Sequence, residues 1–195
     1  FGKFDKKLNR SCFLAYWRVA ESKEIGIGLR LFKKIKERKY KFIGVVGINK
    51  DLINYHKWQG FKTGRLNHHF FINKNIKRKI IKNIKPTQYS NLKVVIKKLN
   101  YSELKRCKKE IFNFQIPEKT PMYLINRYLK NKFYKYSIYL IKNKNFEIIL
   151  VFRKIKYKKV IVLKIVDIIG EENKISKIGN GLEQLSKKYE VEYID

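Results

Sequence analysis

A strand pattern, a glycine-containing loop and a helix pattern follow one another near the start of the chain, and this succession constrains the fold most. Residues 12–19 form an apolar, aromatic run, which predicts a buried strand. After a polar connection come Gly26 and Gly28, and from there apolar residues recur at spacings of three and four, which predicts an amphipathic helix. Residues 42–48 predict a second buried strand, and residues 61–72 predict one or two more strands around Gly64. This order of elements indicates the α/β class.

The glycine loop has the backbone chemistry of an anion site. Glycines let the main chain come close to a ligand, and the amides at the start of a helix point at whatever lies there. Together with the helix dipole they suit a pyrophosphate, so residues 23–28 are a candidate phosphate loop. A tight turn with close helix packing explains the same two glycines, because Gly-x-Gly before a helix is common.

The residues around this loop resemble the GNAT acyltransferase superfamily from its fourth strand onward. The family's pyrophosphate loop, Arg or Gln followed by glycines three and five residues on, is matched with Lys in first place by Lys23, Gly26 and Gly28. Asn49 and the Gly60–Phe61 pair stand where the family has a strand that ends in Asn and a Gly-Phe or Gly-Tyr pair. The resemblance covers residues 11–72.

This resemblance implies an enzyme that transfers an acyl group from acetyl-CoA or another acyl-CoA to an amine or a hydroxyl. It implies that the strand before the loop holds the thioester and that the loop holds the pyrophosphate. The cofactor-binding residues implied in this way are Trp17, Arg18, Val19, Lys23, Ile25, Gly26, Ile27, Gly28, Leu29 and Asn49.

The general acid is one departure from the family pattern. His56 stands where the family usually has a Tyr, and Tyr55 precedes it on a different face of the helix predicted over residues 51–59. A histidine donates a proton readily near neutral pH. Either His56 or Tyr55 is then the catalytic proton donor to the departing thiolate, unless both are ordinary residues of that helix.

The second half of the chain resembles the front half of another GNAT unit. Its predicted elements are a strand at 92–99, helices at 102–114 and 122–129, strands at 137–141, 146–154 and 160–169, and an amphipathic helix at 174–189. After the last of these strands, Gly170 is followed by Glu171 and Glu172, so acids stand where a pyrophosphate would lie. We therefore do not expect this half to bind coenzyme A in the usual way.

The expected organisation is two partial GNAT-like units in tandem, each a mixed sheet flanked by helices. Residues 1–75 are the expected acyl-CoA-binding half-unit, residues 76–88 a basic linker, and residues 89–195 a second, degenerate unit. Truncation of a longer tandem protein explains this order, as does assembly of the two halves into one permuted unit. The chain begins with Phe1 inside a domain-like stretch, which favours a fragment.

Two further stretches point to the acceptor. Residues 64–69 resemble a Gly-x-Leu-Asn-His stretch of GNAT-like proteins linked to surface-polysaccharide synthesis, and residues 123–128 and 165–167 resemble the same proteins. The resemblance implies a small acceptor such as a nucleotide-linked amino sugar, with His68 and Asp167 as acceptor-binding residues. A buried structural carboxylate is the alternative for Asp167. His68 and His69 would face opposite sides of a strand, so no metal site is expected.

The charge of the chain supports a competing hypothesis. The sequence has 47 Lys and Arg against 16 Asp and Glu, a net charge of +31. Such a surface attracts polyanions, so a non-catalytic module that binds nucleic acid or an acidic membrane is the alternative, together with an inactive GNAT fragment. The lysines are scattered along the chain, which disfavours a dedicated nucleic-acid face.

The cysteines and the hydropathy pattern bear on the compartment. Cys12 and Cys107 are isolated and have neither CxxC nor Cys/His ligand spacing, as in a protein of the reducing cytoplasm without disulfides or zinc. No apolar run approaches the roughly 18 residues that a transmembrane helix requires. The sequence thus predicts a cytoplasmic protein without a transmembrane segment.

Overall fold

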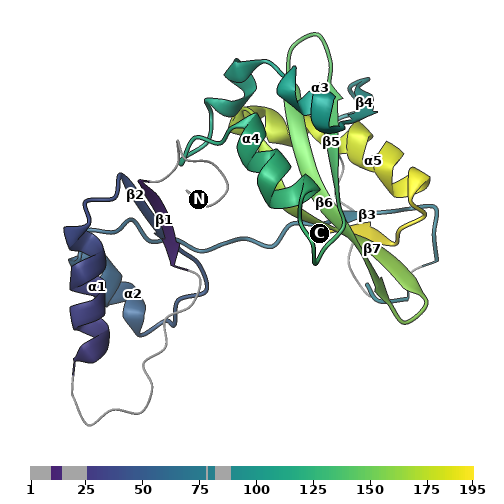
Figure 1. Ribbon diagram of the computed structural model, residues 1–195. Helices are drawn as coiled ribbons and strands as arrows, with labels where there is room; N and C mark the ends of the chain where they lie inside the picture. The colour runs from purple at the N-terminus through teal and green to yellow at the C-terminus, as the bar shows by residue number, and fades with distance from the viewer. Residues whose placement is uncertain (1–9, 15–25, 78, 82–88) are drawn as a thin grey trace. The chain divides into compact units, whose positions relative to one another are not determined.

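The structure, a computed structural model, describes residues 10–14, 26–77, 79–81 and 89–195. The chain divides into two compact units, Phe1–Asn67 and His68–Asp195. Figure 1 shows the helices and strands of each. None of the helices in the described part of the chain combines the length and the hydrophobicity that a bilayer crossing requires.

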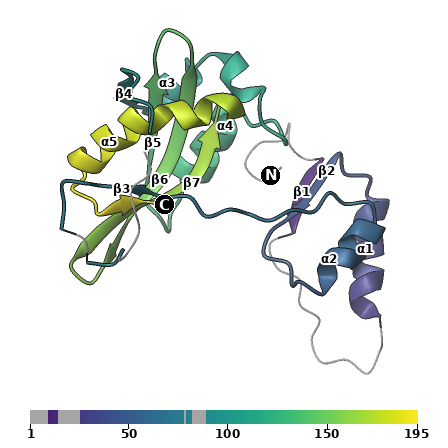
Figure 2. The ribbon, with the colours of Figure 1, turned by 180° about the vertical axis from the view of Figure 1, so that it is seen from behind.

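The first unit is built on two parallel strands joined by a helix. β1 (Ser11–Leu14) pairs in parallel with β2 (Phe42–Val45), and α1 (Ile27–Glu37) lies between them in the chain. Parallel neighbours need such a crossover, so the predicted order of strand, helix and strand is confirmed. α2 (Leu52–Trp58) follows and lies beside α1 (Figures 1 and 2).

The second unit contains a six-stranded mixed sheet with the strand order β3-β8-β7-β6-β5-β4. Four strands are consecutive antiparallel neighbours: β4 (Val95–Lys98), β5 (Tyr136–Lys142), β6 (Glu147–Tyr157) and β7 (Val160–Ile169). β8 (Tyr193–Ile194) runs parallel to β7, and β3 (Phe71–Ile72) runs antiparallel to β8. The observed fold is therefore of the predicted α/β class.

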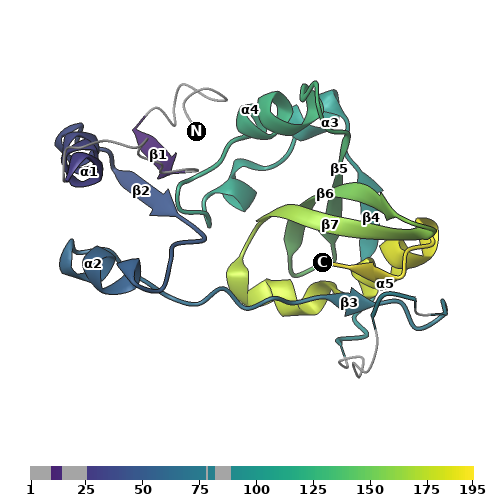
Figure 3. The same cartoon turned by 90° about the horizontal axis from the view of Figure 1, so that it is seen from below.

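Helical segments cover both faces of this sheet. They are α3 (Tyr101–Lys105), η2 (Lys109–Phe112), α4 (Pro121–Leu124), the π-helix η3 (Ile125–Leu129), the 3-10 segment η4 (Glu172–Ile178) and α5 (Gly179–Lys188). α3 and α4 lie on one face and α5 lies on the other, as Figure 3 shows from below. Ile148, Leu150 and Phe152 alternate along β6 and pack with Ile178 and Leu185 in the core beneath α5.

Three predicted elements differ from the structure. Residues 61–70 form no strand, because only Phe71 and Ile72 find a partner in β8. The helix predicted over residues 102–114 ends at Lys105 and resumes as a 3-10 turn, since Lys108 has an extended backbone with φ −59° and ψ 135°. The helix predicted over 174–189 starts with the 3-10 segment η4 and becomes α-helical at Gly179.

The boundary between the units also lies earlier than the sequence predicts. The compact units divide between Asn67 and His68, whereas the predicted linker spans residues 76–88. The physical reason is the pairing of Phe71 and Ile72 with the last strand, which assigns this part of the chain to the second unit.

Two glycines explain how closely α5 packs. A Cβ atom at Gly179 would lie 2.5 Å from the Cβ of Tyr89, and one at Gly181 would lie 2.8 Å from Cδ1 of Ile141. Real Cβ atoms do not approach so closely, so a side chain at either position would push α5 away from its neighbours. The Gly179–Gly181 pair is thus a packing feature of α5.

We expect Gly179→Ala to lower the free energy of unfolding by about 2–3 kcal/mol, the cost of overpacking a well-filled core. This loss exceeds the gain of at most about 1 kcal/mol from the better helix propensity of Ala. Urea denaturation monitored by far-UV circular dichroism measures it. Gly64→Ala is the matched control, because a Cβ there meets nothing within 4 Å. Equal stability of the two variants would contradict the close packing of α5.

Candidate functional site

The helix start in the first unit has the backbone that the candidate phosphate loop requires. Gly26 precedes α1 with φ 85° and ψ 7°, a left-handed conformation that glycine adopts without steric cost. Ile27, Gly28 and Leu29 form the first turn, which carries no acidic side chain. The amides of this turn therefore present the positive end of the helix dipole. No carboxylate within the turn neutralises that charge.

The remaining predicted cofactor-binding residues fall into two groups. Asn49 follows the end of β2, is exposed, and accepts the amide proton of Leu52 on its carbonyl oxygen at 3.0 Å, which starts α2. The others lie outside the described residues: Trp17, Arg18, Val19, Lys23 and Ile25.

The two candidate proton donors occupy different environments. His56 is 2% exposed, and its ring meets Phe32 of α1 and Phe61 edge to face at centroid distances of 5.8 and 5.7 Å. Its Nδ1 is buried and has no hydrogen-bond partner among the described residues. Tyr55 is half-buried and packs against Phe32 and Trp58. A proton donor must reach its ligand, so the burial of His56 favours Tyr55.

In the second unit, Asp167 of β7 lies at the centre of a buried polar cluster. The ammonium of Lys119 donates to Oδ1 of Asp167, and the hydroxyl of Tyr128 donates to Oδ2 at 2.8 Å. The side chains of Lys119 and Asp167 are only 15% and 7% exposed. We call these three residues the Asp167 cluster. The paired cation and hydroxyl compensate a carboxylate that would otherwise be costly to bury.

A β-bulge turns Asp167 toward this cluster. Val151 pairs with Asp167 and Phe152 pairs with Ile165, so Val166 is an extra residue in the register. Before the bulge, Leu163 and Ile165 pack in or against the core beneath α5. Simple alternation would place Asp167 on that same apolar face. The extra residue reverses this, and Asp167 faces the opposite side of the sheet, where Tyr128 lies.

The hydroxyl partner of Asp167, Tyr128, lies on a second irregular stretch of backbone. Tyr128 belongs to the π-helix η3, a helix type that occurs mostly as single turns and frequently at functional sites. The guanidinium of Arg127 lies 5.7 Å from the ring centre of Tyr123 and 5.5 Å from that of Tyr128. Two departures from regular backbone, a bulge and a π-turn, therefore meet at one hydrogen bond.

The protonation of the tyrosines fits a donor role. Burial and the charge of Asp167 raise the pKa of Tyr128 well above its ordinary value, so its hydroxyl stays protonated and donates. Burial raises the pKa of Tyr123 to about 12. Each carboxylate oxygen has two lone pairs, so Asp167 retains acceptor capacity beyond its bonds to Lys119 and Tyr128. Such a group can accept a hydrogen bond from a ligand amine or hydroxyl.

The structure pairs His68 with a different carboxylate. Nε2 of His68 contacts Asp195, which also accepts a hydrogen bond from Lys164 at 3.1 Å. Burial raises the pKa of Asp195, but the bonds from His68 and Lys164 outweigh it, so the pKa lies below its ordinary value. The side chain of His68 is 72% exposed. The prediction that His68 and His69 alternate on a strand is wrong, because residues 61–70 form none.

Sequence reasoning missed Lys119 and the role of Tyr128. Lys119 lies 48 residues from Asp167 in a loop, and nothing in its neighbours distinguishes it from other lysines. Tyr128 lies in the segment 123–128, and its spacing of five residues from Tyr123 is the signal that this segment offers. In the segment after β7, Glu172 occupies the first turn of η4. Comparisons with protein-family models, with curated proteins and with solved structures found no match.

Proposed function

We propose that this chain is an acyl-CoA-dependent acyltransferase of the GNAT type. The observation that carries the proposal is the β1–α1–β2 crossover, whose helix begins at a left-handed Gly26. This geometry supports pyrophosphate binding at the start of α1. Further support comes from the ordered sequence match that runs on through Asn49 and Gly60–Phe61.

The proposed reaction is direct acyl transfer. A nitrogen or oxygen of the acceptor attacks the thioester carbon, the carbon–sulfur bond breaks, and the proton of the acceptor passes to solvent water. Tyr55 donates the proton that the departing thiolate takes up, a role that its partial exposure supports better than the burial of His56 does. Fixing the pyrophosphate at the loop makes the attack effectively intramolecular.

The proposed acceptor is a small molecule with an amine or hydroxyl, of the class of a nucleotide-linked amino sugar. Asp167 is the residue that the resemblance implies for binding that group, and its carboxylate keeps acceptor capacity although its side chain is only 7% exposed. His68 is a weaker candidate, since its Nε2 is engaged by Asp195.

Calorimetric titration of acetyl-CoA into the protein tests the loop. We expect binding in about the micromolar range, and at least about tenfold weaker binding by a Gly26→Asp, Gly28→Asp variant, because two carboxylates at the helix start repel a pyrophosphate. Gly64→Asp adds a negative charge in the same unit but outside the loop, at a position where a side chain meets nothing within 4 Å, and should leave the affinity unchanged. Absence of binding by the folded wild type, or equal binding by the loop variant, would overturn the proposal.

A further inference from the structure

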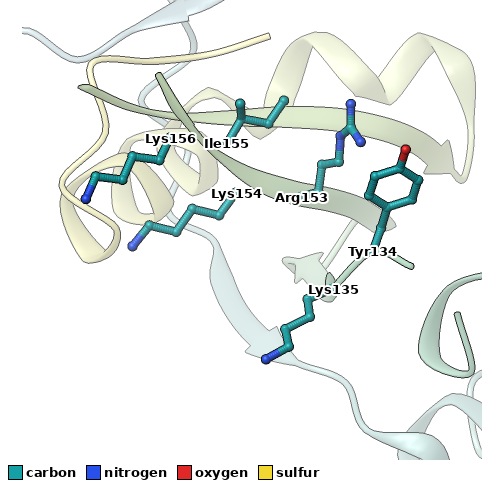
Figure 4. A pocket seen from close by; sticks show the side chains of 6 residues that line it. All are labelled: Tyr134, Lys135, Arg153, Lys154, Ile155 and Lys156. Carbon is teal, nitrogen blue, oxygen red and sulfur yellow. The ribbon is translucent and has the colours of Figure 1, made fainter. Parts of the chain in front are cut away.

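A basic pocket lies along the second half of β6. It has a volume of about 330 Å³ and is lined by Tyr134, Lys135, Arg153, Lys154, Ile155 and Lys156 (Figure 4). Four of these side chains are cationic, and no carboxylate is among the described lining residues. The first residue of β5, Tyr136, pairs with Arg153 of β6. The residues of β6 after Arg153 therefore have no partner in β5. We call this the basic pocket.

The three lysines of the basic pocket are exposed and available to an anion. Lys154 and Lys156 extend in the same direction from β6, and Lys135 extends from the segment before β5 (Figure 4). The guanidinium of Arg153 lies 4.8 Å from the ring centre of Tyr134. Its Nε is buried and has no hydrogen-bond partner among the described residues. A buried donor without a partner is costly to the folded state.

An exposed aromatic side chain stands next to this pocket in the chain. Phe133 is 89% exposed, more than any other large hydrophobic residue of the described part of the chain. Its position is fixed by Asn131, whose Oδ1 accepts the amide protons of Phe133 and Tyr134 at 3.0 and 2.8 Å. Nδ2 of Asn131 donates to the carbonyl of Arg127 at 3.2 Å, which ties the turn to the helix end.

The two chain segments that carry these residues contain charges of a single sign. No Asp or Glu occurs in residues 119–146 or in residues 148–166, which include both the Phe133 turn and the β6–β7 hairpin. The same stretches contribute Lys130, Lys132, Lys158 and Lys159 besides the lysines of the pocket. An exposed apolar side chain beside a cluster of cations matches the chemistry of an anionic lipid bilayer, with phosphates outside and hydrocarbon beneath.

We propose that this surface docks on anionic phospholipid membranes, with the basic pocket receiving a lipid phosphate and Phe133 entering the headgroup region. The proposal does not depend on acyl transfer. A nucleic acid would also supply phosphates, but it would use an aromatic residue as a stacking platform for bases. A lipid interface requires only an apolar side chain at position 133, whereas stacking on a nucleic-acid base requires an aromatic ring there.

Co-sedimentation with vesicles tests the proposal. We expect the chain to bind vesicles of phosphatidylglycerol and phosphatidylcholine and to bind pure phosphatidylcholine far more weakly. Lys154→Gln with Lys156→Gln should weaken vesicle binding about 25-fold. Each lysine near an anionic surface contributes about 1 kcal/mol to the binding free energy, and the variant loses two. Lys33→Gln with Lys34→Gln removes the same charge from the exposed side of α1 and should change binding no more than about twofold.

Two substitutions of Phe133 distinguish a membrane from a nucleic acid as the partner. Phe133→Ala should weaken vesicle binding about tenfold, whereas Phe133→Leu, which stays apolar, should bind within about twofold of wild type. Vesicle binding that is absent at physiological salt, or that the α1 variant loses equally, would overturn the proposal. Equal losses in the Leu and Ala variants, with tight binding of single-stranded DNA, would assign the surface to nucleic acid. Tight binding of inorganic pyrophosphate that Lys154→Gln with Lys156→Gln loses, without vesicle binding, would make the basic pocket a small-anion site.

Discussion

Asp167→Ala is expected to lower the free energy of unfolding of the second unit by about 3–5 kcal/mol, the usual cost of removing one partner of a buried ion pair. The substitution leaves the Lys119 ammonium, with a side chain only 15% exposed, without its carboxylate. It also leaves the Tyr128 hydroxyl without its acceptor. Urea denaturation followed by far-UV circular dichroism and by tyrosine fluorescence would measure the loss.

The position of the tryptophans provides an internal control for this measurement. The chain has two tryptophans, Trp17 and Trp58, and both belong to the first unit. Tryptophan fluorescence therefore reports the unfolding of the first unit, and we expect its midpoint to be unchanged in Asp167→Ala. The variant should also bind acetyl-CoA as the wild type does, because the proposed loop lies in the first unit.

A double-mutant cycle tests whether the loss comes from the pair itself. Lys119→Met with Asp167→Leu replaces both charges by apolar groups of similar size, which is often neutral when the ion pair is buried. We expect the double variant to be more stable than either single variant, with a coupling energy above about 1 kcal/mol. Additive losses in the double variant would show that Lys119 and Asp167 stabilise the unit independently.

The same cluster shows what sequence reasoning can and cannot reach. The run of residues 160–169 predicts β7 as a strand, and the strand is there. Which face Asp167 occupies depends on one extra residue, Val166, and a two-residue alternation contains no sign of it. The sequence therefore yields the candidate carboxylate, whereas its partners follow only from tertiary structure.

Long-range strand pairing likewise limits how accurately the sequence alone can locate the domain boundary. Residues 61–72 have a strand-like composition, and local pattern alone groups them with the preceding unit. In the structure Phe71 pairs with Ile194, more than 120 residues later in the chain, and this contact decides to which unit the segment belongs. By contrast, the α1 crossover depends on local periodicity and one glycine, and the sequence predicts it correctly.

Glu192 holds the second unit together where β8 begins, and its loss is the other large effect that we expect. The residue is 2% exposed, and its carboxylate accepts the amide protons of Lys79, Ile80 and Ile81 at 2.9, 2.8 and 2.9 Å. Glu192→Ala leaves three donors without this acceptor, so we expect a loss of about 3–5 kcal/mol. Glu192→Gln keeps the shape without the charge and should cost about 2 kcal/mol.

The pH dependence of stability distinguishes this carboxylate from an ordinary one. Burial raises the pKa of Glu192, but the bonds from Ile81, Ile80 and Lys79 outweigh it, so the pKa lies below its ordinary value of 4.5. A depressed pKa stabilises the folded state above the unfolded value, and this contribution disappears as the pH falls through the folded value. The stability difference between wild type and Glu192→Gln should therefore be constant near neutral pH and shrink below pH 4.5. Glu190→Gln, at an exposed position two residues away, should show neither the loss nor the pH dependence. A difference that persists undiminished in acid would mean that the charge of Glu192 does not stabilise the turn at residues 79–81.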